Sequence, residues 1–286
     1  MRLDLHTHSY FSDGEYPPEK IKAEATKRRV SFFSITDHNI LWDTKSIKEN
    51  ITENDSSYID GLEISTLHRT SRPTLSLHIL GYGKAFYRNI LNKGLRQTID
   101  GYNSRAHAIT SKLNNIFPDI ELNFESIKNN GHEIYVSRNT LAKLVVEHLK
   151  GTLPLREVLK QFVFIENEND DWMMTPKESF ELIARAGGIP VLAHSGRELR
   201  KLGMSEYKKM IEDLAGDGLR GIEVYYPKHT KEDIATLRSV AKNLGLYITG
   251  GSDWHGNMYT PETEIGQNIP NEDITPFLED KRIMSG

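Results

Sequence analysis

The chain contains no cysteine, although it is 286 residues long. Disulfide bonds, thiolate nucleophiles and zinc–sulfur sites are therefore excluded. Histidine, aspartate and glutamate remain as the side chains that can bind a metal strongly. The positions of the 11 histidines are consequently the most informative feature for any metal site.

Long hydrophobic runs and a strong charge imbalance are also missing. The opening MRLDLHTH carries charge where a secretory signal needs apolar residues, and no run is long enough to span a membrane. The net charge of −4 gives no general attraction to nucleic acid or anionic membranes. A composition of 37% hydrophobic and 27% charged residues is typical of a globular domain. We expect a cytoplasmic enzyme that binds neither a membrane nor duplex nucleic acid stably.

Seven strand-like runs occur along the chain, with helical patterns between most of them. This alternation predicts an α/β fold, either a barrel or an open parallel sheet. The link between the third and fourth runs is too short for a parallel crossover, so these two are predicted to form a hairpin. The runs are RLDLHTH (2–8), SFFSITDHN (31–39), YIDGLEIST (58–66), TLSLHILGYG (74–83), IPVLAHSGR (189–197), LRGIEVYYP (219–227) and LYITGGSDWHG (246–256).

Three helices are predicted between these strands, at 17–30, 175–188 and 230–245. The second has the clearest signals, because Thr175 can cap it and Glu178 completes a capping box. Its predicted end is the Gly-Gly pair at 187–188, and Thr230 is the predicted cap of the third helix.

The stretch from about 88 to 174 has no convincing strand and contains helical patterns at 137–149 and 154–163. We interpret the chain as one domain, with a barrel formed by about 1–87 and 175–286. The intervening residues are predicted to form an inserted helical cap subdomain beside the active-site face.

Every candidate metal-binding side chain is predicted to lie at the C-terminal end of its strand, where (β/α) barrels build their active sites. His6 and His8 are two residues apart, so on a strand their side chains point to the same side. Their convergence with similar residues predicts a site for several metal ions. The residues concerned are His6, His8, Asp13, Asp37, His38, Glu63, His78, His194, Asp253 and His255. The remaining histidines are predicted to bind no metal: His68, His107, His132, His148 and His229.

Seven motifs carry a resemblance to a known family. HTHSYFSDG, TDHN, GLEIS, HILGY, LAHSGR, GIEVYYPKH and GGSDWHG, in that order, resemble the polymerase-and-histidinol-phosphatase (PHP) family of metal-dependent phosphoesterases. Within it the chain is most similar to the nucleotide phosphatase and exoribonuclease-like branch, which has a helical insertion before the LAH motif. The resemblance implies a distorted (β/α)7 barrel with a helical insertion subdomain.

The resemblance also implies a cluster of three divalent metal ions, Mn²⁺, Zn²⁺ or Fe²⁺. The implied ligands of the first are His6, His8, Glu63 and Asp253. Those of the second are His78 and His194, with Glu63 as a bridge. Those of the third are Asp13, His38 and His255. Asp37 is interpreted as a supporting or capping residue rather than a ligand.

Such a centre hydrolyses phosphate esters with a hydroxide formed from metal-activated water. By resemblance, Arg105, Arg138 and Arg197 would hold phosphate oxygens by charge-assisted hydrogen bonds. The chain departs from the branch at Arg138-Asn139-Thr140, where Arg-Pro-His or Arg-Gly-His is common, and at Ser195, where proline is preferred.

The predicted function is a metal-dependent phosphomonoesterase acting on a small nucleotide-like phosphate or a short oligonucleotide end. One alternative is a histidinol-phosphate phosphatase, against which the helical insertion argues. The other is a non-catalytic, metal-stabilised PHP module, against which the complete ligand set argues.

Overall fold

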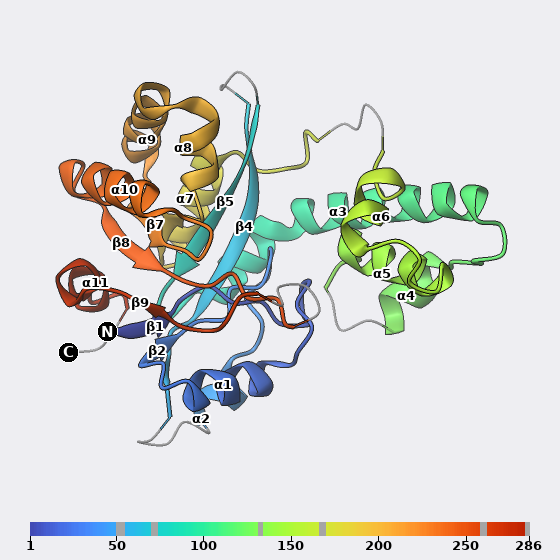
Figure 1. The fold of residues 1–286 in the computed structure, drawn as a ribbon, viewed down its shortest axis with the longest axis horizontal. Coiled ribbons are helices and arrows are strands. Elements are labelled where there is room, and N and C mark those ends of the chain that lie inside the picture. Colours follow the sequence, from blue (N-terminus) through green and yellow to red (C-terminus); the bar gives the residue numbers. More distant parts are fainter. Residues whose placement is uncertain (50–54, 70–73, 131–133, 166–169, 258–261, 284–286) are drawn as a thin grey trace.

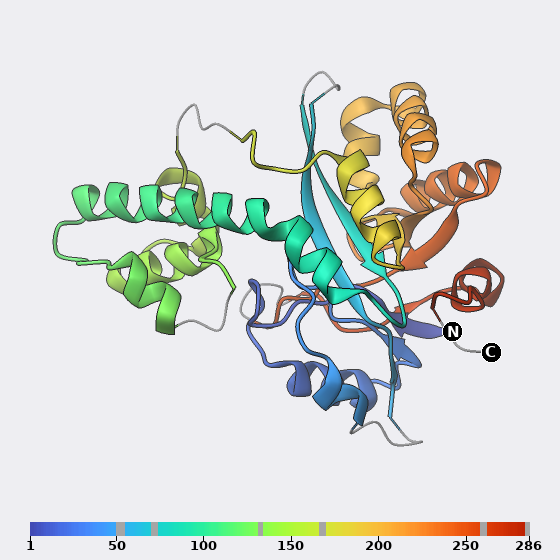
Figure 2. The same cartoon turned by 180° about the vertical axis from the view of Figure 1, so that it is seen from behind.

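The computed structural model has a mixed α/β fold with two sheets and surrounding helices, which confirms the predicted α/β class (Figures 1 and 2). It describes residues 1–49, 55–69, 74–130, 134–165, 170–257 and 262–283. The strands are β1 (Arg2–Asp4), β2 (Phe32–Phe33), β3 (Ser57–Tyr58), β4 (Gly61–His68), β5 (Leu75–Tyr82), β6 (Ile189–Leu192), β7 (Gly221–Tyr225), β8 (Tyr247–Gly250) and β9 (Gln267–Asn268). The helices are α1 (Pro18–Lys27), α2 (Lys45–Glu49), α3 (Arg88–Ile116), α4 (Phe124–Asn130), α5 (Arg138–His148), α6 (Leu155–Gln161), α7 (Pro176–Arg185), α8 (Gly196–Leu202), α9 (Met204–Asp217), α10 (Lys231–Asn243) and α11 (Asn271–Leu278).

The strands form a sheet of order β3-β2-β1-β9 and a sheet of order β4-β5-β6-β7-β8. The predicted hairpin is confirmed, because β4 and β5 pair antiparallel along their whole length. Two isolated parallel bridges lie between segments of the two sheets, one joining Thr7 to Trp254 and the other joining His38 to Glu63. The sheets are thus hydrogen-bonded to each other close to the predicted ligands.

The capping signals place two helices where the sequence predicts them. The side chain of Thr175 accepts from the backbone N–H of Glu178, and the backbone N–H of Thr175 donates to the Glu178 side chain. Thr230 and Asp233 form the same reciprocal pair at the start of α10. After α7, Gly187 has a φ of +89°, a conformation that favours glycine. Both helices bury apolar side chains in a large hydrophobic cluster shared with the five-stranded sheet.

The strands are shorter than the sequence patterns predict. The run at 31–39 is a strand only at Phe32–Phe33, and the run at 58–66 is divided between β3 and β4. Residues beyond the strand ends make single backbone bonds, such as the N–H of Thr36 to the carbonyl of Thr7 at 2.8 Å. Alternation of apolar and polar residues indicates which side chains are buried. Here the buried stretch extends beyond the residues that form a regular strand ladder.

Helices α3, α4, α5 and α6, here called the outer helices, stand to one side of the sheets in both views (Figures 1 and 2). They share a separate hydrophobic cluster that includes Leu113, Leu141 and Val158. The first part of α3 belongs to the main cluster instead, through Leu91 and Leu95. Within the described residues, no helix is long and apolar enough to cross a membrane.

Candidate metal centre

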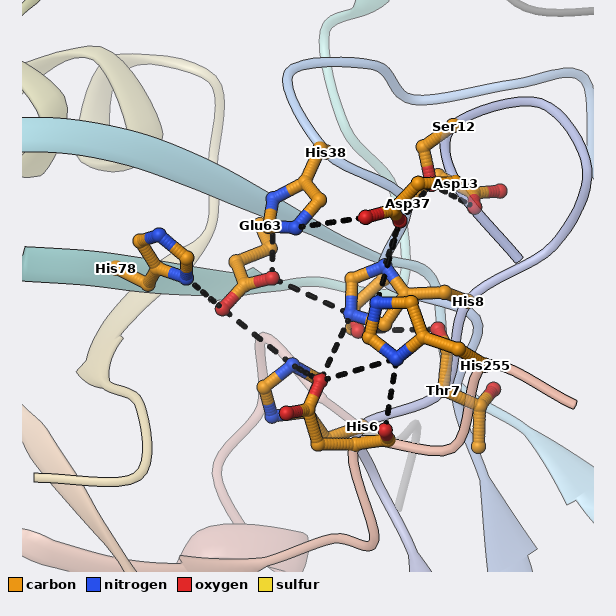
Figure 3. A network of polar contacts seen from close by, with 12 residues as sticks. His6, Thr7, His8, Ser12, Asp13, Asp37, His38, Glu63, His78 and His255 are labelled. Carbon is orange, nitrogen blue, oxygen red and sulfur yellow. Dashed lines mark hydrogen bonds and ion pairs between the residues drawn. The ribbon is translucent and has the colours of Figure 1, made fainter. Parts of the chain in front are cut away.

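The structure brings all nine predicted metal ligands into one region. Figure 3 labels seven of them: His6, His8, Asp13, His38, Glu63, His78 and His255. Within the described residues they form four groups, and in each group the ligand atoms lie within 4.8 Å of one another. The groups are His8–Asp13–His38–His255, His6–His8–Asp253, His6–Glu63–His194 and His38–Glu63–His78. Several residues belong to two groups, so the ligands form a continuous cluster rather than separate sites.

Glu63 lies at the middle of this cluster and is fully buried. Three ring nitrogens face its Oε1: Nδ1 of His78 at 3.0 Å, Nε2 of His6 at 3.4 Å and Nε2 of His194 at 3.5 Å. Two ring nitrogens face its Oε2: Nδ1 of His38 at 3.1 Å and Nε2 of His8 at 3.3 Å. One carboxylate therefore contacts five imidazoles, a geometry suited to a bridging ligand.

Several atoms at the centre of the cluster are buried and make no hydrogen bond within the described part of the chain. They are Nε2 of His6, Nδ1 and Nε2 of His8, Nδ1 of His38 and Oε2 of Glu63. Buried polar atoms are normally hydrogen-bonded, so each of these requires an explanation. Imidazole nitrogens and carboxylate oxygens converging on one volume suit divalent transition metals. The residues present therefore fit the metal ions that the motifs predict.

The protonation of the cluster follows from its burial and its charges. Burial by itself would raise the pKa of the Glu63 carboxyl, yet His38, His6 and His78 hold that pKa well below its usual range. Burial would lower the pKa of His8, but the carboxylates of Asp253 and Glu63, each 3.3 Å from its Nε2, raise that pKa to about 10. For His38 burial prevails and lowers the pKa to about 4. Metal binding requires deprotonated ligands and would release the protons that the carboxylates retain on their neighbours.

The predicted ligands occupy two kinds of position relative to the strands. His6, His8, His38, His194, Asp253 and His255 lie just beyond assigned strand ends, as predicted. Glu63 and His78 do not: they lie inside β4 and β5, because this antiparallel hairpin continues well past the cluster. The prediction that every ligand lies at a strand end was wrong for these two.

Two of the predicted ligands have a strained backbone. His194 has a φ of +29° and Asp253 has a φ of +56°. Such angles are uncommon for residues other than glycine and persist where the surrounding structure enforces them, often at functional sites. The N–H of Asp253 donates to the carbonyl of His6 at 2.8 Å, and the N–H of His194 donates to Oε2 of Glu223 at 2.7 Å. These bonds hold both residues in place.

Glu223 is a residue of the centre that the sequence reasoning missed. It is fully buried, and its Oε1 lies 3.1 Å from Nδ1 of His6. A carboxylate on Nδ1 fixes the ring and leaves Nε2 to face a metal. The available signal was an acidic residue inside the apolar run GIEVYY, which belongs to one of the seven motifs.

Asp37 also supports the centre and belongs to none of the four ligand groups. Its carboxylate accepts from the backbone N–H and the hydroxyl of Ser9 at 2.7 and 2.6 Å, and from the hydroxyl of Ser12 at 2.7 Å. These bonds fix the loop that carries Asp13, in line with the supporting role predicted for Asp37 (Figure 3).

A cavity of about 320 Å³ lies between the metal centre and the outer helices. On the side of the centre it is lined by Asp13, His38 and His78, and on the other side by residues that include Arg105 and Arg138. Two of the three predicted phosphate-binding arginines thus line a cavity that reaches the predicted ligands. Arg197 is not among the lining residues; it lies on α8, 3.1 Å from the carbonyl of Ser76.

Both arginines already have protein partners. The Nε of Arg138 donates to the carbonyl of Val163 at 2.6 Å. Arg105 donates to Asp170 at 2.5 Å and lies over the ring of Trp172 at 4.7 Å. These contacts hold the guanidinium groups at the cavity wall.

Among the described residues, the histidines predicted to bind no metal lie outside the four groups. His107 packs against Phe124, and His148 lies 3.5 Å from Asp119. His229 has a structural position, because its Nε2 accepts from the N–H of Gly196 and its Nδ1 donates to the carbonyl of Val224. His132 lies outside the described residues.

A buried cluster of imidazoles and carboxylates in an α/β fold is typical of a metal-dependent hydrolase. The PHP domain family matches residues 4–249, and the chain belongs to that family. The predicted resemblance is therefore confirmed, and so is the predicted class of phosphoric ester hydrolase.

Curated relatives cover almost the whole chain. The 5′-3′ exoribonuclease Rnm of Escherichia coli K12 is 26% identical, over 93% of this chain and 88% of its own. The 3′,5′-nucleoside bisphosphate phosphatase of Chromobacterium violaceum is 25% identical, over 96% and 93%. The phosphoribosyl 1,2-cyclic phosphate 1,2-diphosphodiesterase of Eggerthella lenta is 26% identical, over 94% and 100%.

Two solved structures share the fold. An amidohydrolase from Chromobacterium violaceum, with bound sulfate and no metal, has a TM-score of 0.79 at 23% identity and covers 99% of this chain and 97% of its own. A proposed metal-dependent phosphoesterase from Bifidobacterium adolescentis has a TM-score of 0.76 at 21% identity and covers 99% and 96%.

The central position of Glu63 leads to the first prediction. Glu63→Gln keeps the shape of the side chain but removes the charge that contacts five rings, so it should remove more than one equivalent of bound metal and nearly all hydrolysis. Metal content measured by plasma mass spectrometry, with circular dichroism as a check on folding, tests this. His107→Ala and His148→Ala are the controls and should keep wild-type metal content; full occupancy in Glu63→Gln would contradict the bridging role.

The second prediction concerns Glu223. Glu223→Gln should weaken metal binding about 10–100-fold while the protein stays folded, because the amide orients His6 less strongly than the carboxylate does. Isothermal titration calorimetry with Mn²⁺ measures the metal affinity of the variant and of wild type. An unchanged affinity would show that His6 is held adequately by its backbone alone.

Proposed function

We propose that the chain is a metal-dependent phosphomonoesterase that hydrolyses nucleotide-like phosphate esters at a centre of three divalent metal ions. The observation that carries the proposal is an adjacency: the ligand cluster around Glu63 forms one wall of a cavity whose other wall contains Arg105 and Arg138. A phosphate monoester needs both features, because its oxygens are negatively charged and its phosphorus resists attack by an anion.

The proposed metals are Mn²⁺, Zn²⁺ or Fe²⁺, and when bound they would activate a water and neutralise phosphate oxygens. We assign one metal to His6, His8, Glu63 and Asp253, a second to Glu63, His78 and His194, and a third to Asp13, His38 and His255. For the first metal, the assignment is supported by the group of Asp253 with His6 and His8. For the third metal, it is supported by the group that contains Asp13, His38 and His255. His78 and His194 each contact Oε1 of Glu63, as ligands beside a bridge would.

The places of Arg105 and Arg138 on the cavity wall support the roles proposed for them. Arg138 and Arg105 carry permanent positive charge and are proposed to hold phosphate oxygens that do not contact the metals. Arg197 is the third proposed phosphate-binding residue. It would contact a part of the substrate that extends beyond the cavity. The outer helices are proposed to act as a cap subdomain over the substrate, with the barrel formed by about 1–87 and 175–286.

The proposed scaffold is a closed, distorted barrel of seven strands. Ladders join β1 to β2 and run from β4 through β5, β6 and β7 to β8. The bridge between His38 and Glu63 links the extension of β2 to β4, and the bridge between Thr7 and Trp254 links the extensions of β1 and β8. These pairings support a complete ring, with His38 and Glu63 at one of its two irregular joints.

The names of the relatives support the proposed substrate class. They describe enzymes acting on RNA ends, on a nucleoside bisphosphate and on a cyclic sugar phosphate. The net charge of −4 is consistent with a small phosphorylated substrate rather than duplex nucleic acid. A cytoplasmic location remains a prediction from composition.

A substrate panel with purified, Mn²⁺-loaded protein tests the proposal. We expect release of inorganic phosphate from AMP or a 3′,5′-bisphosphate to exceed release from histidinol phosphate, and chelation should abolish it. Short RNA and a 1,2-cyclic sugar phosphate test the reactions named for the relatives. Preference for histidinol phosphate would favour the first alternative, and no turnover of any substrate by metal-loaded protein would favour a non-catalytic module.

The next prediction concerns Arg138. If its guanidinium holds a phosphate oxygen in ground and transition states alike, Arg138→Ala should mainly raise KM. A charge-assisted contact of roughly 2–3 kcal/mol corresponds to a loss of about 30–150-fold in kcat/KM. Metal content should not change, because Arg138 is not a ligand.

Arg156→Ala is the matched control, since Arg156 is an exposed arginine of α6 that is not among the residues lining the cavity. Arg138 also bonds the carbonyl of Val163, so thermal unfolding should be recorded for both variants. A wild-type kcat/KM for Arg138→Ala across the panel would show that this residue does not contact the phosphate.

A further inference from the structure

The segment from Tyr135 to Asn139 reaches from the outer helices to the metal centre at two points. Nδ2 of Asn139 donates to Oδ2 of Asp13 at 3.0 Å. Nδ2 of Asn39 donates to the hydroxyl of Tyr135 at 3.3 Å, and Asn39 directly follows His38 in the chain. Asp13 and His38 belong to the same ligand group, so both contacts converge on one side of the centre.

The position of Asn139 is determined by the outer helices. It lies in the first turn of α5, after the N-cap residue Ser137, whose side chain accepts from the backbone N–H of Thr140. The same helix is anchored by Leu141 and Val145, which are fully buried in the separate hydrophobic cluster. Asn139 is therefore presented to the centre by a packed helix rather than by a loose loop.

The two oxygens of the Asp13 carboxylate have different neighbours. Oδ1 lies 3.2 Å from Nε2 of His255 and 3.6 Å from Nδ1 of His8. Oδ2 accepts the hydrogen bond from Asn139 and lies 3.9 Å from Nε2 of His38. A hydrogen bond to one oxygen of a ligating carboxylate orients the other toward the metal, and such bonds affect metal affinity.

We propose that Asn139 is a positioning residue that couples the outer helices to the Asp13–His38–His255 group. Metal bound by that group and the placement of α5 then stabilise each other, because coupling between two binding equilibria is reciprocal. The inference rests on the proposed function in taking this group as a metal site.

The test compares wild type with Asn139→Ala and a matched control, Asn114→Ala. Asn114 lies on α3 and bonds both backbone groups of Leu122 at 2.8 Å, so its loss loosens the outer helices without touching a ligand. Each protein is stripped with a chelator and titrated with Mn²⁺, and metal content is measured after dialysis. Hydrogen exchange of the α5 amides is recorded with and without Mn²⁺.

Asn139→Ala should weaken one metal equivalent about 10–100-fold, leave the others unchanged, and lose the extra protection of α5 that Mn²⁺ gives wild type. Asn114→Ala should keep all equivalents and keep that protection. Wild-type affinity in Asn139→Ala would overturn the coupling, and so would an equal loss in Asn114→Ala. Failure of wild type to hydrolyse any phosphate ester would refute the proposed function alone, because this test reads metal binding and exchange rather than turnover.

Discussion

The structure depends on one buried carboxylate, that of Glu63, and on the rings that surround it. A fully buried charge is very unfavourable unless partners compensate it, and here five imidazoles face its two oxygens. Protons on those rings can balance part of the charge, but several ring nitrogens and Oε2 itself lack hydrogen bonds within the described residues. Divalent cations would satisfy all of these atoms together, which explains why polar residues occupy a place that apolar side chains could fill.

The rest of the scaffold can be understood as support for this arrangement. Glu223 fixes His6 and the backbone of His194, and Asp37 fixes the loop that carries Asp13. The pairing of the two sheets at His38 and Glu63 brings ligands from distant parts of the chain together. The positive φ angles of His194 and Asp253 show that the backbone itself accepts strain at this place.

The sequence predicted the fold class, the hairpin and the capped helices, because alternation, short links and capping residues act locally. It also predicted which side chains gather in the cluster, since their types are distinctive and the motifs occur in a specific order. It did not reveal Glu223. A single acidic residue in an apolar strand gives the same sequence pattern whether its carboxylate bonds a histidine ring, as here, or the backbone of a neighbouring helix. The sequence could not show the bond between Asn139 and Asp13, which joins residues 126 positions apart and depends on tertiary packing. Strand lengths were overestimated where the chain stays buried without regular pairing.

The most direct test of the account is anomalous X-ray diffraction from crystals of the protein grown with Mn²⁺. The account predicts several metal peaks, with neighbouring metals about 3.5–4 Å apart and both oxygens of Glu63 within bonding distance of metal. His78 and His194 should each ligate a metal that also contacts Glu63. A single peak, or peaks that contact the surrounding histidines but leave Glu63 without a metal, would contradict the central role assigned to this carboxylate.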